Sequence, residues 1–258
     1  MSATKIVTRL YTDAPLEAGG EVPLGPDRAH QLRSVLRLQP GAAIALFNAR
    51  DGEWSATVES LGKTAATARV QAQRRPPAPE PDLWLLFAPL KSGRIDWLAE
   101  KATELGVSRL CPVLTRRTTM DRVNLGRLAA NAREAAEQCE RLSLPAVDEP
   151  VPLPRLLDAW AAERLILLAD EAGAAPPLPA ALAGSADRPL AVLVGPEGGF
   201  DAGERELLRS RPFVQPVTLG PRILRAETAA AAALSVVQAL RGDWAVPPRG
   251  QAVTCGQS

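Results

Sequence analysis

Downstream of residue 82, the hydrophobic positions follow two alternating patterns. Residues 83–90 (LWLLFAPL) are a continuous apolar run, which is typical of a strand buried in a parallel sheet. The next apolar residues recur at helical spacing and stop before a glycine suited to a helix end: Ile95, Leu98, Ala99, Ala102 and Leu105, then Gly106. Further strands are predicted at 107–114, 164–169, 190–194 and 215–219, helices at 124–141 and 226–240, and a loop at 173–189. The pattern predicts an α/β domain with a largely parallel sheet, in which ligands bind at the carboxyl ends of strands.

Upstream of residue 74, the pattern changes to short strands. Strands predicted at 42–48, 53–59 and 64–72 follow a predicted helix at 27–38, and Asp51-Gly52 is a strong hairpin signal. Residues 74–82 (RRPPAPEPD) are rich in proline, which continues neither a helix nor a central strand. We therefore expect two domains, a small β-barrel over residues 1–74 and the α/β domain over residues 83–245.

The composition is that of an ordinary globular protein, but the distribution of charge along the chain is uneven. The chain has 258 residues, of which 46% are hydrophobic and 23% charged, as in ordinary globular proteins. Its net charge of +1 conceals two basic segments, because residues 1–75 and 91–141 each carry ten basic and seven acidic groups. Nearly all the cations are arginines, which bind phosphate in a fork. These charges permit a localised surface for a polyanion, and an arginine-rich solvated surface fits them equally well.

Few cysteines and a single histidine limit the available chemistry. Cys111, Cys139 and Cys255 have no CxxC spacing, and with His30 alone we expect neither a metal site nor a histidine-based triad. The first residues lack the apolar stretch of a secretory signal, and no run reaches the length of a membrane span. The expected location is the cytoplasm.

Two glycine-containing turns follow predicted strands. The first, GPEGG at 195–199, lacks the Lys-Ser/Thr of a phosphate loop and does not fit GxGxxG. A tight turn that needs glycine only for its geometry is the alternative there. The second contains Gly220 and leads into a helix that begins near Arg225, a cation that opposes the helix macrodipole. Such local conflicts favour function, and two such turns on neighbouring strands would enclose a cofactor.

Five ordered motifs resemble one known family and together span nearly the whole chain. They are HQLRSVLR at 30–37 with ALFN at 45–48, KSGRIDWLAEKATELGV at 91–107, EQCER at 137–141, LVGPEGGFD at 193–201 and LGPRILRAETAAAAAL at 219–234. The family is that of the bacterial 16S rRNA (uracil-N3)-methyltransferases, the RsmE type of the SPOUT superfamily. The resemblance implies a PUA-like β-barrel domain followed by an α/β domain with a trefoil knot within about 164–240.

The resemblance also implies an activity. A homodimer would transfer a methyl group from S-adenosylmethionine to N3 of a uridine, expected at position 1498, in the 16S rRNA of the 30S subunit. A SPOUT methyltransferase for another RNA atom, such as a ribose 2′-oxygen, is one alternative. A non-catalytic RNA-binding factor for ribosome assembly is another.

The resemblance assigns the methyl donor to the two glycine turns and to the end of the preceding strand. The implied cofactor-binding residues are Ala169, Gly195, Pro196, Glu197, Gly198, Gly199, Leu219, Gly220, Ile223, Leu224 and Arg225. Ile223 and Leu224 would enclose the adenine, with plain core packing as the alternative for either of them.

Methylation of uracil N3 requires loss of its proton, which a base or a cation at the uracil oxygens would assist. Arg225 is the first candidate for the cation. Glu197 and Glu227 are candidate bases, with helix capping or ion pairing as the alternative for each. Arg141, with Gln138 one helical turn away, is expected at the target uridine or its phosphate. A surface pair of Arg141 with Glu137 is the alternative.

Further contacts with rRNA are expected from exposed cations and the single histidine: Arg9, His30, Arg33, Arg37, Lys91 and Arg94. Two departures from the family pattern stand out. Arg116-Arg117 occupies a stretch in which an acidic residue is expected, and Ala226 replaces a threonine.

Overall fold

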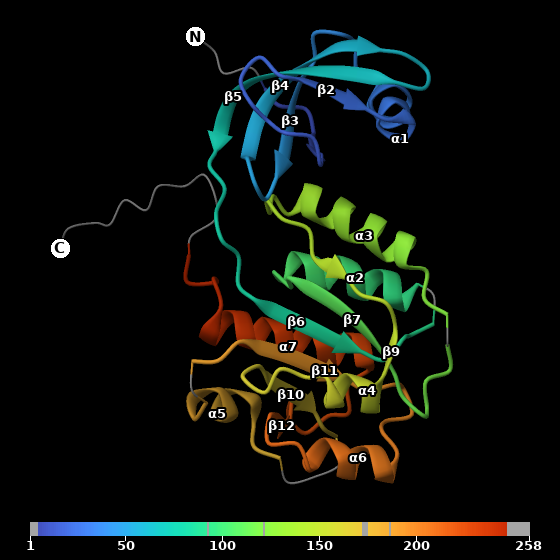
Figure 1. The fold of residues 1–258 in the computed structure, drawn as a ribbon, viewed down its shortest axis with the longest axis vertical. Helices are drawn as coiled ribbons and strands as arrows, with labels where there is room; N and C mark the ends of the chain where they lie inside the picture. The colour runs from blue at the N-terminus through green and yellow to red at the C-terminus, as the bar shows by residue number, and fades with distance from the viewer. Residues whose placement is uncertain (1–4, 92, 121, 172–174, 186, 247–258) are drawn as a thin grey trace, which may run out of the picture. The chain divides into compact units, whose positions relative to one another are not determined.

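The structure is a computed structural model, and it describes residues 5–91, 93–120, 122–171, 175–185 and 187–246. The chain forms two compact units (Figure 1). The first unit comprises Met1–Pro79 together with Ala136–Ser143, and the second comprises Glu80–Ala135 and Leu144–Ser258. The short segment Ala136–Ser143 was not predicted to belong to the N-terminal domain.

The first unit contains a five-stranded sheet of order β1-β3-β4-β5-β2. Its strands are β1 (Arg9–Tyr11), β2 (Glu21–Leu24), β3 (Ala43–Asn48), β4 (Gly52–Leu61) and β5 (Ala66–Arg75). β1 runs parallel to β3, and the other neighbours are antiparallel. Helix α1 (Pro26–His30) continues into the π-helical turn η1 (Gln31–Val35). The helix predicted at 27–38 therefore consists of an α-helical part and a π-helical part, and it ends at Val35. The three predicted strands correspond to β3, β4 and β5.

The turn between β3 and β4 confirms the hairpin signal. Gly52 has a φ of +80°, and a Cβ at this position would collide with the backbone of Arg75. The backbone N–H of Asp51 donates to the Asn48 side-chain oxygen at 2.6 Å, a local bond that closes the turn. Both observations explain why this turn requires its particular residues.

The second unit contains a parallel sheet of order β12-β10-β11-β6-β7-β8, and β9 also pairs with β7. The strands are β6 (Leu83–Phe87), β7 (Arg109–Leu114), β8 (Ala146–Val147), β9 (Val151–Pro152), β10 (Leu165–Ala169), β11 (Leu190–Val194) and β12 (Val214–Val217). Every pairing is parallel, as the continuous apolar runs predicted. The central strands β10, β11 and β6 are buried on both faces of the sheet.

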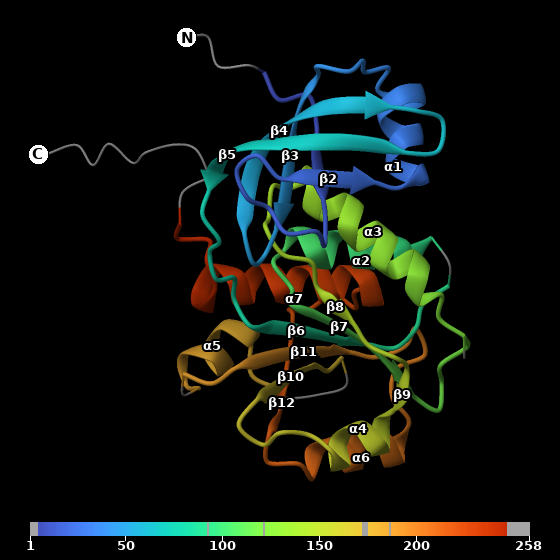
Figure 2. The ribbon, with the colours of Figure 1, turned by 45° about the horizontal axis from the view of Figure 1, so that its top comes forward.

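Helices cover both faces of this sheet (Figures 1 and 2). They are α2 (Arg94–Glu104), α3 (Leu125–Gln138), α4 (Leu153–Asp158), α5 (Leu178–Ala183), α6 (Ala202–Arg209) and α7 (Ala226–Arg241). Alternate strand residues face opposite layers: Leu85 and Val192 pack in the cluster that includes residues of α2 and α7, whereas Leu86 and Leu193 pack with residues of α4 and α6. The sheet is therefore enclosed, and its loop ends are the parts open to ligands.

One segment of the second unit differs from its prediction. The loop predicted at 173–189 contains the short helix α5, because Pro177 and Pro179 suit the start of a helix and Leu178 and Leu182 are buried. No helix within the described residues is long and apolar enough to cross a membrane.

Candidate cofactor and active site

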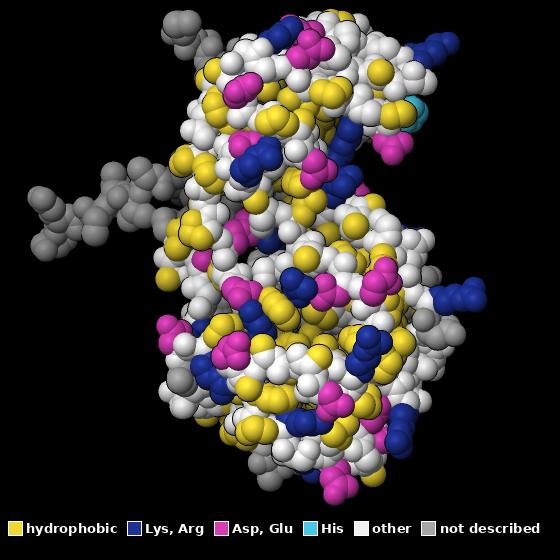
Figure 3. Space-filling model, viewed as in Figure 1, with side chains coloured by type: hydrophobic (Ala, Val, Ile, Leu, Met, Phe, Trp, Pro, Cys, Tyr) yellow, Lys and Arg dark blue, Asp and Glu magenta, His cyan; other side chains and the backbone are white. Residues whose placement is uncertain are grey.

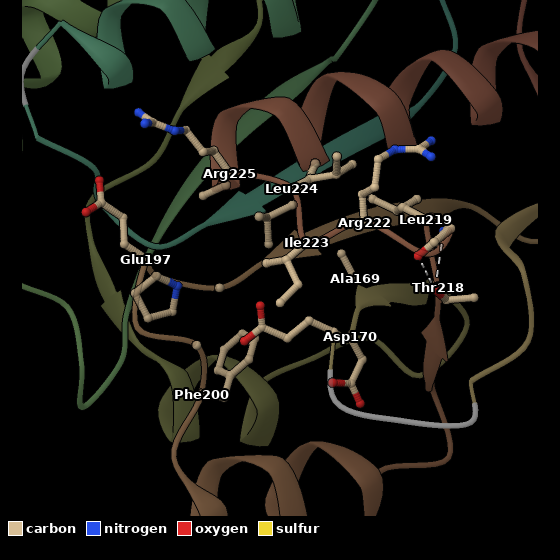
Figure 4. Close-up of a pocket in the computed structure, with 18 of the residues that line it drawn as sticks. Ala169, Asp170, Glu197, Phe200, Thr218, Leu219, Arg222, Ile223, Leu224 and Arg225 are labelled. Carbon is tan, nitrogen blue, oxygen red and sulfur yellow. Dashed lines mark hydrogen bonds between the residues drawn. The ribbon is translucent and has the colours of Figure 1, made fainter.

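A cavity of about 460 Å³ lies at the carboxyl ends of β10, β11 and β12. Its volume falls in the usual range for small-molecule sites, roughly 300–1,000 Å³. Figure 4 shows Glu197 and Arg225 toward one end of the cavity, Asp170 and Thr218 toward the other, and Ile223 between them. The lining residues come from the end of β10, the loop at 195–200 and the loop at 218–226, together with Arg94, Arg205 and Ala229. Neighbouring strands thus bring both glycine turns to one cavity.

The first loop is shaped by glycines that no larger residue would replace without a shift. A Cβ at Gly195 would lie 2.7 Å from the Phe200 ring. Gly199 has a φ of +66°, and a Cβ there would lie 2.8 Å from Oε1 of Glu171. The Gly199 N–H donates to the Pro196 carbonyl at 2.8 Å, which closes the turn. Glycine therefore permits both the turn and the close approach of its backbone to a ligand.

Helix α6 follows this loop and begins with a capping box. The Asp201 carboxylate accepts from the Glu204 N–H at 2.7 Å, and the Glu204 carboxylate accepts from the Asp201 N–H at 3.1 Å. The exit of the glycine loop is therefore held by a defined helix start.

The second loop presents an apolar surface to the cavity. Gly220 has a φ of +104°, and Thr218 Oγ1 accepts from its N–H at 3.3 Å. Ile223 lines the cavity although its side chain is 82% exposed. Leu224, also in the wall, is half-buried and packs against the core. An exposed isoleucine in a cavity wall suits a flat apolar ligand surface.

Arg225 lies at the N-cap position of α7, with its side chain exposed in the cavity wall. Its carbonyl accepts the first helical bond, from the Ala229 N–H at 2.7 Å. No hydrogen bond or ion pair of its guanidinium is found among the described residues. Since a cation here opposes the helix dipole, its placement favours contact with a bound anionic or polar group.

Arg94 joins the two sides of the cavity. Its guanidinium forms a close ion pair with Glu197 of the first loop, and its Nε lies 3.6 Å from Oε1 of Glu227 in the first turn of α7. Glu227 Oε2 is buried and makes no hydrogen bond. Arg94 was predicted to contact rRNA, but its contacts favour a role in holding these two carboxylates.

Arg9 and Arg141, two other predicted site residues, belong to the first unit. Arg9 is nearly buried, and its Nε donates to Glu53 at 2.6 Å. Its other nitrogens donate to three carbonyls at or beyond the end of α3, those of Ala136, Glu137 and Arg141, at 2.9–3.1 Å. Burial lowers the pKa of Arg9, and Glu53 opposes this effect. These contacts complement a helix C-terminus and do not favour the phosphate contact predicted for Arg9.

The Glu137–Arg141 segment is also fixed within the first unit. The Glu137 carboxylate forms a close ion pair with Arg28 and accepts from the Tyr11 N–H at 3.0 Å. Arg141 is only 5% exposed and donates to the Ser143 hydroxyl at 2.9 Å. Arg141 does not line the cavity, and its predicted catalytic role stays a prediction, as does substrate contact by the exposed Gln138.

The remaining predicted RNA contacts are at the surface. His30, Arg33, Arg37 and Lys91 are all exposed. On the face of the second unit seen in Figure 3, basic and acidic side chains alternate without a large patch of one sign. Groups of three or more His, Cys, Asp or Glu residues suited to a metal ion are not found within the described ranges.

Several cavity residues were not predicted from the sequence. Asp170 and Glu171 directly follow β10, and Phe200, Arg205, Thr218 and Arg222 lie beside the predicted loops. Two acidic residues at a strand's carboxyl end were a usable signal. Conversely, Gly198 does not line the cavity, unlike the other predicted cofactor-binding residues.

Comparison with known proteins agrees with this geometry. A sequence model of an RNA methyltransferase domain matches residues 77–238, and one of an RNA methyltransferase PUA domain matches residues 24–71. Ribosomal RNA small subunit methyltransferase E of Rickettsia conorii is 32% identical over 234 residues, which cover 90% of this chain and 95% of the relative. The chain belongs to the methyltransferase E family.

Other members of the methyltransferase E family extend this likeness. The Mycobacterium tuberculosis protein is 31% identical and covers 91% of this chain and 92% of its own length. A crystal structure of methyltransferase E from Neisseria gonorrhoeae bound to S-adenosyl methionine has a TM-score of 0.82 and 28% identity, covering 92% of this chain and 99% of that one. A putative Legionella pneumophila methyltransferase in complex with the same cofactor has a TM-score of 0.80 and 30% identity, covering 90% and 97%.

These comparisons confirm the family that the motifs resembled. They also confirm the fold class, an α/β methyltransferase domain joined to a PUA-like domain. The position of the trefoil knot within about 164–240 stays a prediction.

Proposed function

We propose that this methyltransferase E family member transfers a methyl group from S-adenosylmethionine to N3 of a uridine in the 16S rRNA of the small ribosomal subunit. The supporting observation is the cavity of about 460 Å³ that both glycine loops form together at the strand ends. Relatives named for the small subunit rRNA, and neighbours solved with this cofactor, support the same assignment.

The residues of the cavity fit the proposed cofactor. A Cβ at Gly195 or Gly199 would lie within 3 Å of Phe200 or Glu171, so both positions keep a bare backbone, whose N–H and carbonyl groups would meet the donor. Ile223 and Leu224 supply apolar surface for the adenine. When bound, the cofactor would supply an electrophilic methyl group on its sulfonium. Asp170 and Glu171 also line the cavity, and their carboxylates pair with Arg209 and Arg205 of α6.

Arg225 is assigned to the uracil ring. Methylation at N3 follows loss of the N3 proton, and negative charge then develops on the uracil oxygens. A guanidinium held at the cavity wall would stabilise that charge. The folded protein tolerates the unfavourable interaction of this cation with the dipole of α7. Glu197 lies at the same end of the cavity, where Arg94 holds its carboxylate, and is our candidate acceptor of the proton.

Binding of rRNA is assigned to exposed residues of the first unit. His30, Arg33 and Arg37 lie on or next to α1 and η1 and are available to phosphates. We further infer that the protein acts as a homodimer in the cytoplasm. Sedimentation of the purified protein would test the dimer.

Mapping of methylated nucleosides tests the proposed function. A strain that lacks the gene should lose N3-methyluridine from 16S rRNA, and the wild-type gene should restore it. Arg225→Ala should restore at most about a hundredth of the methylation rate, because it removes a charge stabiliser from the transition state. Loss of a ribose methyl group instead would support the 2′-oxygen alternative. An unchanged methylation pattern, with no cofactor binding in calorimetry, would support the non-catalytic alternative.

A further inference from the structure

Arg116-Arg117, the departure noted in the sequence, forms part of a tight turn after β7. The Thr118 N–H donates to the Thr115 carbonyl at 3.1 Å, and the Thr115 N–H donates to the Thr118 hydroxyl at 2.9 Å. The Arg116 N–H donates to the buried carboxylate of Glu204 at 2.7 Å. The turn is thus closed on itself and anchored to the start of α6.

Arg117 extends from this turn to the glycine loop. Its Nη1 donates to the Gly198 carbonyl at 2.7 Å. Its aliphatic chain lies along the same residue, because a Cβ at Gly198 would be 3.6 Å from Arg117 Cδ. Arg116 supports the arrangement from the other side, with Nη1 3.0 Å from the Asp201 carboxylate at the N-cap of α6.

The peptide that accepts this hydrogen bond from Arg117 would rotate readily if the bond were absent. It joins Gly198 to Gly199, and a peptide between two glycines flips without side-chain clashes. The positive φ of Gly199 and its N–H bond to Pro196 both depend on one orientation of this peptide. Glu197 and Gly199, on either side of Gly198, line the cavity, whereas Gly198 does not.

We propose that Arg117 is a positioning residue for the methyl donor. It selects one orientation of the Gly198–Gly199 peptide and thereby preorganises the first wall of the cavity. Arg117 acts through the loop and touches no reacting atom. Without it, the loop would populate other orientations, and donor binding would have to restore the order at a cost in affinity. This inference rests on the proposed use of the cavity for S-adenosylmethionine.

Calorimetry of S-adenosylmethionine binding to the full-length protein tests the inference. Arg117→Met should raise the Kd about tenfold, and Arg117→Lys should raise it less, because lysine keeps a donor but loses the forked geometry. Arg188→Met is the matched control, since Arg188 Nε also donates to a backbone carbonyl, that of Glu163 at 2.9 Å, outside the cavity. Its Kd should equal that of the wild type.

Hydrogen exchange distinguishes positioning from general destabilisation. Without cofactor, Arg117→Met should speed amide exchange at Gly199. Its thermal midpoint should change no more, relative to wild type, than that of Arg188→Met does. Should Arg117→Met fail to fold, Arg117→Lys carries the same two measurements. Wild-type affinity together with unchanged exchange at Gly199 would overturn the proposal. A wild-type protein that binds no S-adenosylmethionine would instead refute the proposed function.

Discussion

Backbone freedom at single residues shapes the candidate site as much as side-chain chemistry does. Gly199 combines a positive φ with a close approach to the Glu171 side chain, and the same loop carries Glu197 into the cavity wall. Arg225 contributes the opposite kind of feature, a side chain in a locally unfavourable position. A strained backbone and a cation at a helix N-terminus both lower local stability, and such features often mark a functional site.

Gly199→Ala should weaken binding of S-adenosylmethionine at least tenfold. The substitution strains the backbone at φ +66° and places a Cβ 2.8 Å from Oε1 of Glu171, so the Glu171 side chain in the cavity wall must also shift. Calorimetry would measure the change. Gly184→Ala is the control, because a Cβ there meets its neighbours at 3.7 Å and φ is negative. Equal affinities of the two variants would contradict the role given to Gly199.

The glycine loops were predictable from the sequence because their signal is local. Gly195 directly follows the apolar run at 190–194, and Gly220 directly follows the strand predicted at 215–219, so each strand and its turn are predicted together. Asp170 and Glu171 follow a predicted strand directly, which was a usable signal, but their place in this cavity also depends on the position of β10 between β11 and β12, which sequence spacing does not reveal. The role of Arg9 depends on carbonyls more than a hundred residues away, and an isolated arginine gives no sign of them.

At the scale of elements, periodicity predicted the long strands and helices and failed for the short ones. Strands β10 and β11 agree with their predicted ranges within one residue. β8 and β9 have two residues each, too few for any pattern. Helix α3 ends at Gln138 where the pattern continued to residue 141, because Glu140 adopts a φ of +64° beyond it. Tertiary contacts, and not periodicity, set that boundary.

Glu53 joins three elements of the first unit, since Arg9 of β1 and Arg74 and Arg75 of β5 all donate to its carboxylate. Burial raises the pKa of Glu53, but hydrogen bonds from Arg9 and Arg75 outweigh it, so the pKa lies below 4.5. The ionised form therefore stabilises the fold above about pH 4.5, and this stability is lost as the pH falls through the lowered pKa.

Glu53→Gln should destabilise the first unit by about 3 kcal/mol at pH 7, because it leaves buried cations without their anion. The difference from wild type should shrink below pH 4.5. Urea unfolding followed by hydrogen exchange in β3, β4 and β5 would measure both effects. Glu59→Gln is the control, because Glu59 forms an exposed pair with Arg69 in the same sheet and should matter little. A constant difference at all pH values would contradict the linkage.

For the molecule as a whole, the two units divide the work of a methyltransferase E. The second unit holds the cavity, and the first matches an RNA methyltransferase PUA domain. The net charge is nearly zero, so attraction of the whole chain to rRNA is weak and the contacts must be local. Exposed arginines of the first unit are the candidates.

Arg33→Gln should weaken binding to 30S subunits mainly at low salt. The plot of log K against log salt concentration should become less steep, its negative slope smaller in magnitude by about 1 for one lost phosphate contact. The affinity for S-adenosylmethionine should stay unchanged. Filter binding over a series of salt concentrations would measure the slope. Arg69→Gln is the control, because Arg69 is already paired with Glu59 and Glu21. An unaltered slope in Arg33→Gln would place the phosphate contact elsewhere.

The Ala136–Ser143 segment, held by Arg9 and Arg28, has a consequence for dissecting this protein. A gene truncated after residue 79 would encode the five strands of the first sheet but not the segment that accepts hydrogen bonds from those guanidinium groups. Such a product should be poorly soluble, and a chimaera that exchanges only the first 79 residues should fail for the same reason. The first 79 residues therefore do not make up a complete folding unit, even though they contain all five strands of the first sheet.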